Sequence, residues 1–492
     1  MSTATMGRRS VRKVLAMAVA VSTLVLVGAV AAAPAQADPA NTYRSVPTGR
    51  YPIDVDATVD GNDLFVINRG DNGIADLRVY DAASFAELNV VTFGPGSNFN
   101  PTAVQVTPDG SQVWVSFYNP GQILVYPLAD LVAGASPTPT VLTGGGGFVD
   151  LTEDPTGAYI YAATLFNPQY QFSTTDLTAP ARTISLPYGS RGVTVDADGT
   201  AVYFTQYAPA PAGGVQAVDV AADGSLSTGV FTPTGDLPWG ITYSAAANRL
   251  LSSNSGNPFS VSGFSPPNGV VNTVAVPCGP RLGDANASGT RAYLACLTGG
   301  VLVSDYSVSP PAGHLVPIGG NVEAVDVVSD ASGASSRVYA TSGASDELLV
   351  FDRPTLTSGG DQTITEGQSG VFTAVAANFW ETTTWQVSTD GGATWVDVPG
   401  ADGDSLTVQG TLTDSGNLYR LVATSAFFDP VASEPMLLTV TALPPTPTPT
   451  QAPTATASGL AATGTDAGRA LLLATVAVVL GTLALLGRRR RV

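Results

Sequence analysis

The sequence predicts an all-β protein in which a seven-bladed β-propeller precedes a smaller β-sandwich. Three observations favour this fold class. The chain contains 53 glycines and 36 prolines but only 12% charged residues, a composition typical of short strands and tight turns rather than long helices. A two-strand unit built around a turn recurs with the period of propeller blades. A single strand-rich stretch of different rhythm follows the last repeat.

Each repeat places an aromatic residue beyond a turn glycine. The clear copies are Gly61 with Phe65, Gly110 with Trp114, Gly157 with Tyr161, Gly199 with Tyr203 and Gly289 with Tyr293. Two looser copies have Ala247 at the turn before Leu251, and Gly333 six residues before Tyr339. Because these turn positions lie 42 to 49 residues apart, we expect seven blades within residues 38–357.

Further strands complete each repeat. Leu77–Tyr80 is a third strand and Val90–Phe93 a fourth, and four antiparallel strands make one blade. The seventh copy ends after its third strand, near Arg353, whereas Tyr43–Pro47 precedes the first copy. We therefore expect Tyr43–Pro47 to supply the missing strand and close the ring. In their blade rhythm the repeats resemble surface-layer and YVTN-type propellers, which are broadly related to the lactonase-like seven-bladed group.

Residues 358–442 form the second strand-rich unit. Trp385 and Tyr419 stand where an immunoglobulin fold has its strand C tryptophan and its tyrosine corner. The unit resembles a bacterial immunoglobulin-like domain, which implies an Ig-like β-sandwich. The disulfide positions of that family fall at Ala374 and Leu421, so the resemblance implies an apolar core without the bridge.

Residues Ser388–Trp395 match the S-x-D-x-G-x-x-W Asp-box of sialidases. The motif is a hairpin turn capped by an aspartate, and it occurs once, in the sandwich unit. We interpret it as a turn, because a fold motif alone does not carry chemistry.

The first 37 residues have the anatomy of a secretory signal peptide. A basic start is followed by the apolar run Val14–Ala33 and by the A-x-A site Ala35–Ala37. Cleavage is expected between Ala37 and Asp38. The alternative, an uncleaved membrane anchor, is disfavoured by the small residues at the exit.

The C-terminus combines three elements. Residues 460–464, namely Leu460, Ala461, Ala462, Thr463 and Gly464, precede the apolar span Ala470–Leu486 and the arginines 488–491. The span has the minimum length for crossing a bilayer, and the arginines favour a cytoplasmic end. The pentapeptide resembles the LAxTG variant of the LPxTG sorting signal of Gram-positive bacteria.

That resemblance implies that a class E-like sortase cleaves after Thr463 and joins it to peptidoglycan. Residues 465–492, with the C-terminal transmembrane sorting helix, would then be left behind, so the protein spans the membrane only as a precursor. A plain single-pass anchor is the alternative. The Pro/Thr-rich linker 443–459 favours an extended, wall-spanning conformation.

Charge excludes one class of partner. Between Asp38 and Thr463 the chain has 12 arginines, no lysine and 38 acidic residues, a balance of −26. Such a field repels phosphate backbones, so nucleic acid is not an expected partner. Without lysine, the mature chain also lacks the amine that pilus shaft subunits use to polymerise.

Two cysteines remain, Cys278 and Cys296. Export to an oxidising compartment favours a disulfide between them, and the alternative is two buried thiols. Hairpin geometry returns Cys296 beside Arg281, near Cys278.

Candidate catalytic and metal-binding residues are few. Several aspartates lie near predicted hairpin turns, and we interpret them as turn residues rather than calcium ligands; they are Asp54, Asp56, Asp60, Asp63, Asp196 and Asp198. The lone histidine, His314, lies in a Pro-rich connector without an acidic neighbour in sequence. We find no phosphate loop or nucleophile motif. No cofactor or metal is therefore expected.

These features predict a wall-anchored surface protein that binds an extracellular protein or glycan through the propeller. Two alternatives stay open. One is a lactonase-like propeller hydrolase, which would show charged residues converging at the channel mouth, and the other is a passive wall-layer component.

Overall fold

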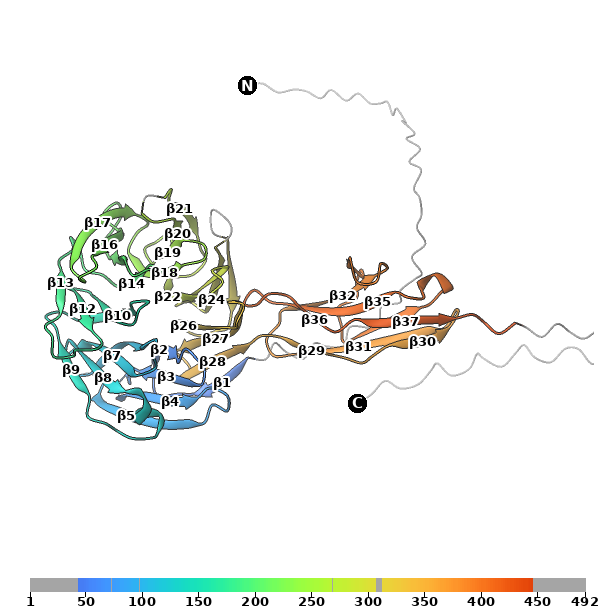
Figure 1. The fold of residues 1–492 in the computed structure, drawn as a ribbon, viewed down its shortest axis with the longest axis horizontal. Helices are drawn as coiled ribbons and strands as arrows, with labels where there is room; N and C mark the ends of the chain where they lie inside the picture. The colour runs from blue at the N-terminus through green and yellow to red at the C-terminus, as the bar shows by residue number, and fades with distance from the viewer. Residues whose placement is uncertain (1–42, 72, 97, 268, 307–311, 446–492) are drawn as a thin grey trace, which may run out of the picture. The chain divides into compact units, whose positions relative to one another are not determined.

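The protein is described by a computed structural model covering residues 43–71, 73–96, 98–267, 269–306 and 312–445. Strands dominate these residues (Figure 1), and their helices are α1 (Leu128–Val132) and the 3-10 helix η1 (Leu412–Asp414). No helix in this part of the chain is long and apolar enough to cross a membrane. The expected signal peptide, linker, sorting motif and apolar span lie outside the described residues, apart from the first residues of the linker.

Seven four-stranded antiparallel sheets make up the repeat region, as predicted. Their first strands are β2 (Pro52–Ala57), β6 (Asn100–Val106), β10 (Phe148–Glu153), β14 (Val193–Val195), β18 (Pro238–Ser244), β22 (Pro280–Ala285) and β26 (Val322–Ser329). Their second strands are β3 (Asp63–Asn68), β7 (Gln112–Asn119), β11 (Tyr159–Thr164), β15 (Ala201–Gln206), β19 (Arg249–Asn254), β23 (Arg291–Cys296) and β27 (Ser335–Ser342). Their third strands are β4 (Ile74–Asp81), β8 (Gln122–Pro127), β12 (Gln169–Ser173), β16 (Gly214–Val220), β20 (Ser260–Phe264), β24 (Gly300–Asp305) and β28 (Glu347–Asp352). Their fourth strands are β5 (Glu87–Pro95), β9 (Thr140–Thr143), β13 (Arg182–Ile184), β17 (Leu226–Pro233), β21 (Asn272–Ala275), β25 (Ala312–Pro317) and β1 (Arg44–Pro47).

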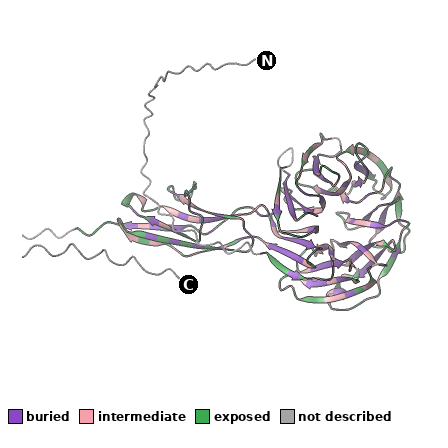
Figure 2. Ribbon diagram, turned by 180° about the vertical axis from the view of Figure 1, so that it is seen from behind, coloured by how far each residue is buried: buried purple, intermediate pink, exposed green. Residues whose placement is uncertain are grey.

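The sheets are arranged in a ring (Figure 1), and we call the axis that their first strands surround the central channel. Each first strand contacts the first strands of the two neighbouring sheets, and β26 contacts β2, so the first strands are innermost and form a closed ring. Apolar side chains fill the space between blades, and the second and third strands are mostly buried, whereas several first strands, such as β2, β10 and β22, are largely half-buried (Figure 2). Because all blades repeat one strand order, the beginnings of the innermost strands meet at one face of the ring. We call this the mouth face.

The strand expected to close the ring does so. In β1, Val46 pairs with Leu348 and Arg44 with Val350, both in the antiparallel strand β28. Val46 is buried, and the hydroxyl of Tyr80 donates a hydrogen bond to the carbonyl of Pro47. The first residues of the repeat region therefore complete the last blade, which leaves no long unpaired edge there.

The predicted glycine turns connect the first two strands of the blades. Six of these turn glycines have φ between 64° and 81°, in the left-handed region that glycine adopts at low cost. In the fifth blade the prediction was one residue off, because Asn248 and not Ala247 has positive φ there, at 45°. Asparagine is the usual substitute for glycine in this conformation.

Residues 355–441 form two further sheets. One contains β29 (Thr355–Ser358), β31 (Ser369–Ala377) and β34 (Ser405–Gln409). The other contains β30 (Gln362–Thr365), β37 (Met436–Thr441), β35 (Leu418–Thr424), β32 (Thr382–Ser388), β33 (Val396–Asp397) and β36 (Val431–Ala432). Trp385, Tyr419 and Leu421 lie in one buried cluster with Ala374, so these two sheets share a core.

Aromatic residues of this two-sheet unit pack against the seventh and sixth blades. The ring of Phe427 lies 4.8 Å from that of Phe351 and 5.9 Å from that of Tyr293. Asp429 forms an ion pair with Arg291 at 2.5 Å. All three rings are fully buried, so this contact is an apolar core with a charged edge.

Candidate functional site at the channel mouth

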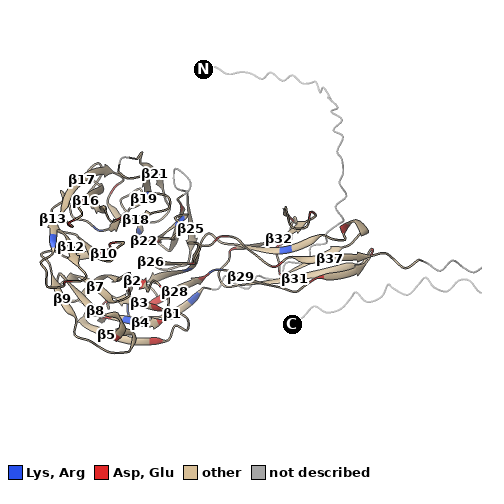
Figure 3. Ribbon diagram, in the orientation of Figure 1, with Lys and Arg blue, Asp and Glu red and all other residues tan. Residues whose placement is uncertain are grey.

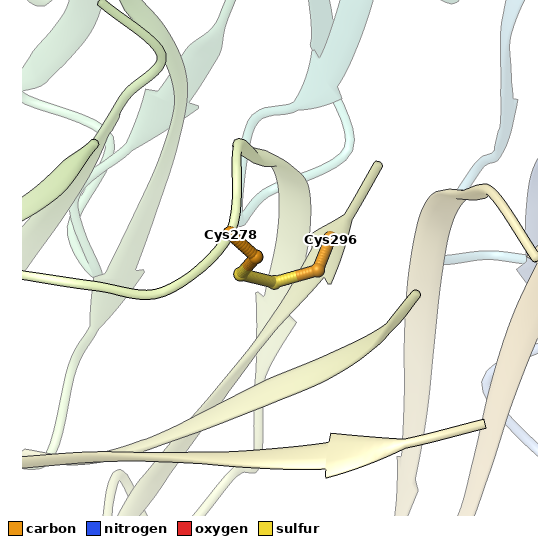
Figure 4. The surroundings of a disulfide bond; sticks show 2 residues. All are labelled: Cys278 and Cys296. Atoms are coloured by element: carbon orange, nitrogen blue, oxygen red, sulfur yellow. A yellow bond between two sulfur atoms is a disulfide. The ribbon is translucent and has the colours of Figure 1, made fainter. Parts of the chain in front are cut away.

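The two cysteines join in a disulfide (Figure 4). Their Cα atoms are 5.6 Å apart, within the range that a bridge requires. Cys296 lies opposite Pro280 rather than opposite Arg281, because the β22–β23 register shifts at an irregularity between Pro280 and Gly283. Both cysteines are fully buried, so the bond has a structural position, away from solvent.

The interpretation of the acidic residues as turn residues is wrong for Asp54 and Asp56. Both lie on the innermost strand β2, not in its turn. Asp60 does cap the turn, since it accepts hydrogen bonds from the Thr58 hydroxyl and the Asn62 amide at 2.6 and 3.1 Å. These bonds lower the pKa of Asp60. Within the described residues, no group of three or more potential ligands is placed to hold a metal ion.

His314 is not in a connector. It lies on β25, the fourth strand of the sixth blade, and its Nε2 is 3.3 Å from Oε1 of Glu381. The histidine thus has an acidic neighbour that is 67 residues away in sequence. Its side chain is 62% exposed, which suits a surface contact between the two parts better than a catalytic pair.

The Asp-box folds as the expected turn. Asp390 accepts hydrogen bonds from the Ser388 hydroxyl and the Thr394 amide, each at 2.8 Å. The indole nitrogen of Trp395 donates to the carbonyl of Gly392 at 3.1 Å. Every one of these bonds is local.

Carboxylates instead gather along the central channel. Seven acids lie on innermost strands: Glu323 at the mouth, and Asp54, Asp56, Asp150, Glu153, Asp284 and Asp326 further along. Several accept a backbone N–H from the next blade, as Asp54 does from Val104 at 2.9 Å and Asp150 from Val193 at 2.9 Å. These carboxylates therefore connect neighbouring blades.

Burial in the channel disfavours the charged form of these acids. It raises the pKa of Asp54 and Glu153 to about 7 and that of Asp284 to about 6. Burial raises the pKa of Asp56 and Asp326 well above the usual range, and neighbouring carboxylates add to the effect. Charged residues also lie on outer strands of the blades and on the two-sheet unit, among them Glu87 on β5, Arg182 on β13 and Arg420 on β35 (Figure 3).

A cavity of about 270 Å³ opens at the mouth face. Its wall is formed by residues at the beginnings of innermost strands and at the ends of second strands. The residues are Ile53, Asn100, Thr102, Val149, Arg191, Trp239, Arg281, Leu282 and Glu323, together with Arg69, Tyr118 and Leu165. The mouth therefore gathers three of the arginines of an otherwise acidic chain.

Trp239 lies at the part of the cavity wall that carries two arginines, Arg191 and Arg281. The guanidinium carbons of Arg191 and Arg281 lie 3.8 and 3.7 Å from the centre of its ring. Arg191 also lies over Tyr207 at 4.5 Å. Burial lowers the pKa of both arginines; the charge of Arg281 adds to this lowering for Arg191, whereas the charge of Glu323 opposes it for Arg281. Within the described residues neither forms an ion pair.

Two other charged residues of the wall, Arg69 and Glu323, have partners within the protein. Arg69 lies 4.1 Å over the ring of Tyr51 and forms an ion pair with Asp71 at 2.7 Å. The Tyr51 hydroxyl donates a hydrogen bond to Glu323 at 2.7 Å. Burial, and then Glu323, raise the pKa of Tyr51. The arginines of the mouth thus differ: Arg69 is paired with a carboxylate, whereas Arg191 and Arg281 form no ion pair within the described residues.

Sequence reasoning missed this site, although a signal for it exists. The residue eight positions before each turn is Ile53, Thr102, Val149, Arg191, Trp239, Arg281 and Val325. The first six of these line the cavity. In the seventh blade the β26–β27 register shifts between Val322 and Val325, and Glu323 lines the cavity instead. Aligning the repeats at this position would have located the mouth.

Comparison with known proteins supports the fold. No protein-family model matches the chain, and no curated protein sequence does. Among solved structures, hydrazine synthase of Kuenenia stuttgartiensis is similar at a TM-score of 0.53 and 14% identity, over 65% of this chain and 99% of that one. The Cps50 (Swd1) β-propeller domain of Myceliophteria thermophila is similar at a TM-score of 0.50 and 9% identity, over 63% of this chain and 100% of that domain. At these identities the likeness shows a β-propeller fold alone.

Proposed function

We propose that this protein is an exported binding module, fixed to peptidoglycan through Thr463, that holds an extracellular ligand at the mouth of its propeller channel. The observation that carries the binding role is the mouth cavity, in which aromatic and charged side chains converge from several blades. Ligand sites favour such concave places, with a few polar groups among apolar walls. A propeller also supplies a rigid frame, since every blade is packed between two others.

The anchoring role is supported by the order of elements at the two chain ends. A signal peptide, a sorting motif, an apolar span and terminal arginines occur in one chain. The two-sheet unit then serves as an Ig-like spacer, and the buried Trp385 in its core suits that assignment. The linker 443–459, at about 3.1 Å per residue, reaches roughly 50 Å and suits a path through the wall.

Anchoring is tested by Thr463→Ala in the full chain, with Thr456→Ala in the linker as the matched control. The Thr463 variant is expected to leave the muramidase-released wall fraction and to appear in the membrane or the medium. The control is expected to stay wall-linked. Unchanged wall linkage of Thr463→Ala would show that the sorting assignment is wrong.

Binding at the mouth is tested by a glycan and protein screen with residues 38–442, which contain every described strand. Trp239→Ala is expected to abolish capture of the ligand. Trp395→Ala is the matched control, because Trp395 also lies beneath an arginine, Arg420 at 4.0 Å, but in the two-sheet unit. If the Trp239→Ala variant still captures the ligand, the ligand does not bind at the mouth.

A propeller hydrolase is the second candidate. It is favoured by the hydrogen bond between Tyr51 and Glu323 beside the arginines of the mouth, since charged groups at this place were the expected mark of an enzyme. Turnover of lactone, sialoside or phosphoester substrates that is lost in Glu323→Gln would replace the binding role with this one. We expect no turnover.

A further inference from the structure

We propose that the channel mouth binds an oxyanion, a carboxylate or phosphate group of a sugar-sized ligand, at the edge of the Trp239 ring that Arg191 and Arg281 flank. This inference rests on the proposed binding role and deepens it by naming the ligand chemistry.

Two cations share one aromatic ring without an acid between them. Both guanidinium carbons lie within 4 Å of the centre of the Trp239 ring, so the two charges lie within about 8 Å of each other across the indole. The one acid in the cavity wall, Glu323, accepts the Tyr51 hydroxyl; its charge acts on Arg281, but within the described residues the two form no ion pair. Half-buried like charges are costly unless a counter-charge joins them.

Acidic residues far outnumber arginines in the mature sequence, and some of the arginines form ion pairs with them. The mature sequence has 38 acidic residues for 12 arginines, and five arginines form ion pairs with them within 4 Å, namely Arg69, Arg78, Arg291, Arg337 and Arg353. Acids are therefore abundant as partners, yet the two arginines on Trp239 have none in the described residues. An external anion would supply the missing charge.

The geometry also leaves donors available. Stacking on an indole uses the face of a guanidinium, so the N–H groups at its edge stay free for the paired hydrogen bonds that carboxylates and phosphates accept. The Nε of Arg191 is buried without a hydrogen-bond partner. The side-chain oxygen of Asn100, in the same cavity wall, is also buried and unpartnered. The fitting ligand carries an oxyanion and at least one hydroxyl or amine hydrogen.

The size of the cavity and the residues further along the channel restrict the ligand further. About 270 Å³ is small for a drug-sized molecule and suits one sugar-sized residue. The channel carboxylates, among them Asp54 and Asp150, lie further along the innermost strands. Burial favours the protonated form of these acids, and they offer no positive charge, so an anion finds its cationic partners at the mouth.

Isothermal titration of residues 38–442 with glucuronate, glucose 6-phosphate and glucose tests this inference. At low salt we expect saturable binding of one or both anionic sugars and none of glucose. Arg191→Gln and Arg281→Gln should each weaken binding at least tenfold, while Arg420→Gln, the control from the Trp395 stack, should change it less than twofold. Arg281→Lys keeps the positive charge but not the planar guanidinium with its paired N–H donors, so it should bind with intermediate affinity. It replaces Arg281→Gln should that variant misfold.

Three results would overturn the oxyanion assignment: glucose binding as tightly as glucuronate, equal affinities in the mouth and control variants, or no binding of either anion at millimolar concentration. The wider proposal fails differently. A neutral ligand whose capture is lost in Trp239→Ala refutes the oxyanion but keeps the mouth. A ligand whose capture survives Trp239→Ala refutes the mouth itself.

Discussion

Asp54→Asn should abolish the pH dependence that Asp54 gives to the stability of the propeller. Asp54 lies half-buried on β2, where its carboxylate accepts the amide of Val104 in the next blade. Asparagine has nearly the same shape and keeps an acceptor for this bond, but it cannot ionise. The substitution therefore separates the charge of this side chain from its hydrogen bond.

The sign follows from the raised pKa of Asp54, about 7 against an ordinary 3.8. The folded protein holds this proton at pH values where the unfolded chain has lost it. The stabilisation is therefore complete below about pH 4 and is lost as pH rises through 7. The difference corresponds to at most about 4 kcal/mol. Since the side chain is partly open to the channel, we expect about 1 to 2 kcal/mol.

Thermal unfolding of residues 38–442 at pH 4 and pH 8 measures this effect. At pH 8 the Asp54→Asn variant should be more stable than the wild type, by a few degrees, while at about pH 4 the two should be nearly equal. Asp60→Asn is the control. Hydrogen bonds lower the pKa of Asp60, so removing this carboxylate should lower the stability of the protein at both pH values. A variant equally or less stable than the wild type at pH 8 refutes the reasoning.

Three further predictions concern the frame that holds the mouth. Cys278→Ser with Cys296→Ser opens a loop of 18 residues and should cost about 3 kcal/mol, measured by urea unfolding; two alkylatable thiols in the unreduced wild type would show that no bridge forms. Deleting residues 38–47 removes β1 and exposes the edge of β28, so light scattering should show aggregation, and a monomer of unchanged melting temperature contradicts the closure. Phe427→Ala empties a fully buried site between aromatic rings and should cost about 3 to 5 kcal/mol; a loss below about 1 kcal/mol would mean that the two-sheet unit does not depend on this contact.

The repeat is the part of the fold that sequence reveals best. Turn residues with positive φ, such as Gly61 and Gly157, are dictated locally, because few side chains tolerate that conformation. Blade count and ring closure then follow from the spacing of the turns. Local errors arose at two places. In the fifth blade Asn248 rather than Ala247 adopts the positive φ of the turn, and in the sixth a register shift places Cys296 opposite Pro280 instead of Arg281.

The site was harder to predict because it is assembled from residues far apart in sequence. Arg191 and Arg281 come from different blades and meet only at Trp239, between them in sequence and in space. The channel carboxylates were misread for a related reason. Asp54 resembles a turn residue in sequence, and its true neighbour, Val104, is 50 residues away. His314 lies next to Glu381 because the two-sheet unit, which contains Glu381, packs against the sixth blade.

The position of a bound ligand tests the central claim most directly. A crystal structure of residues 38–442 with the ligand that the screen identifies would show it. The account predicts ligand density at the mouth, in contact with Trp239 and within hydrogen-bond distance of Arg191 or Arg281. Density on the outer strands of the blades or on the two-sheet unit, with the mouth empty, would contradict it.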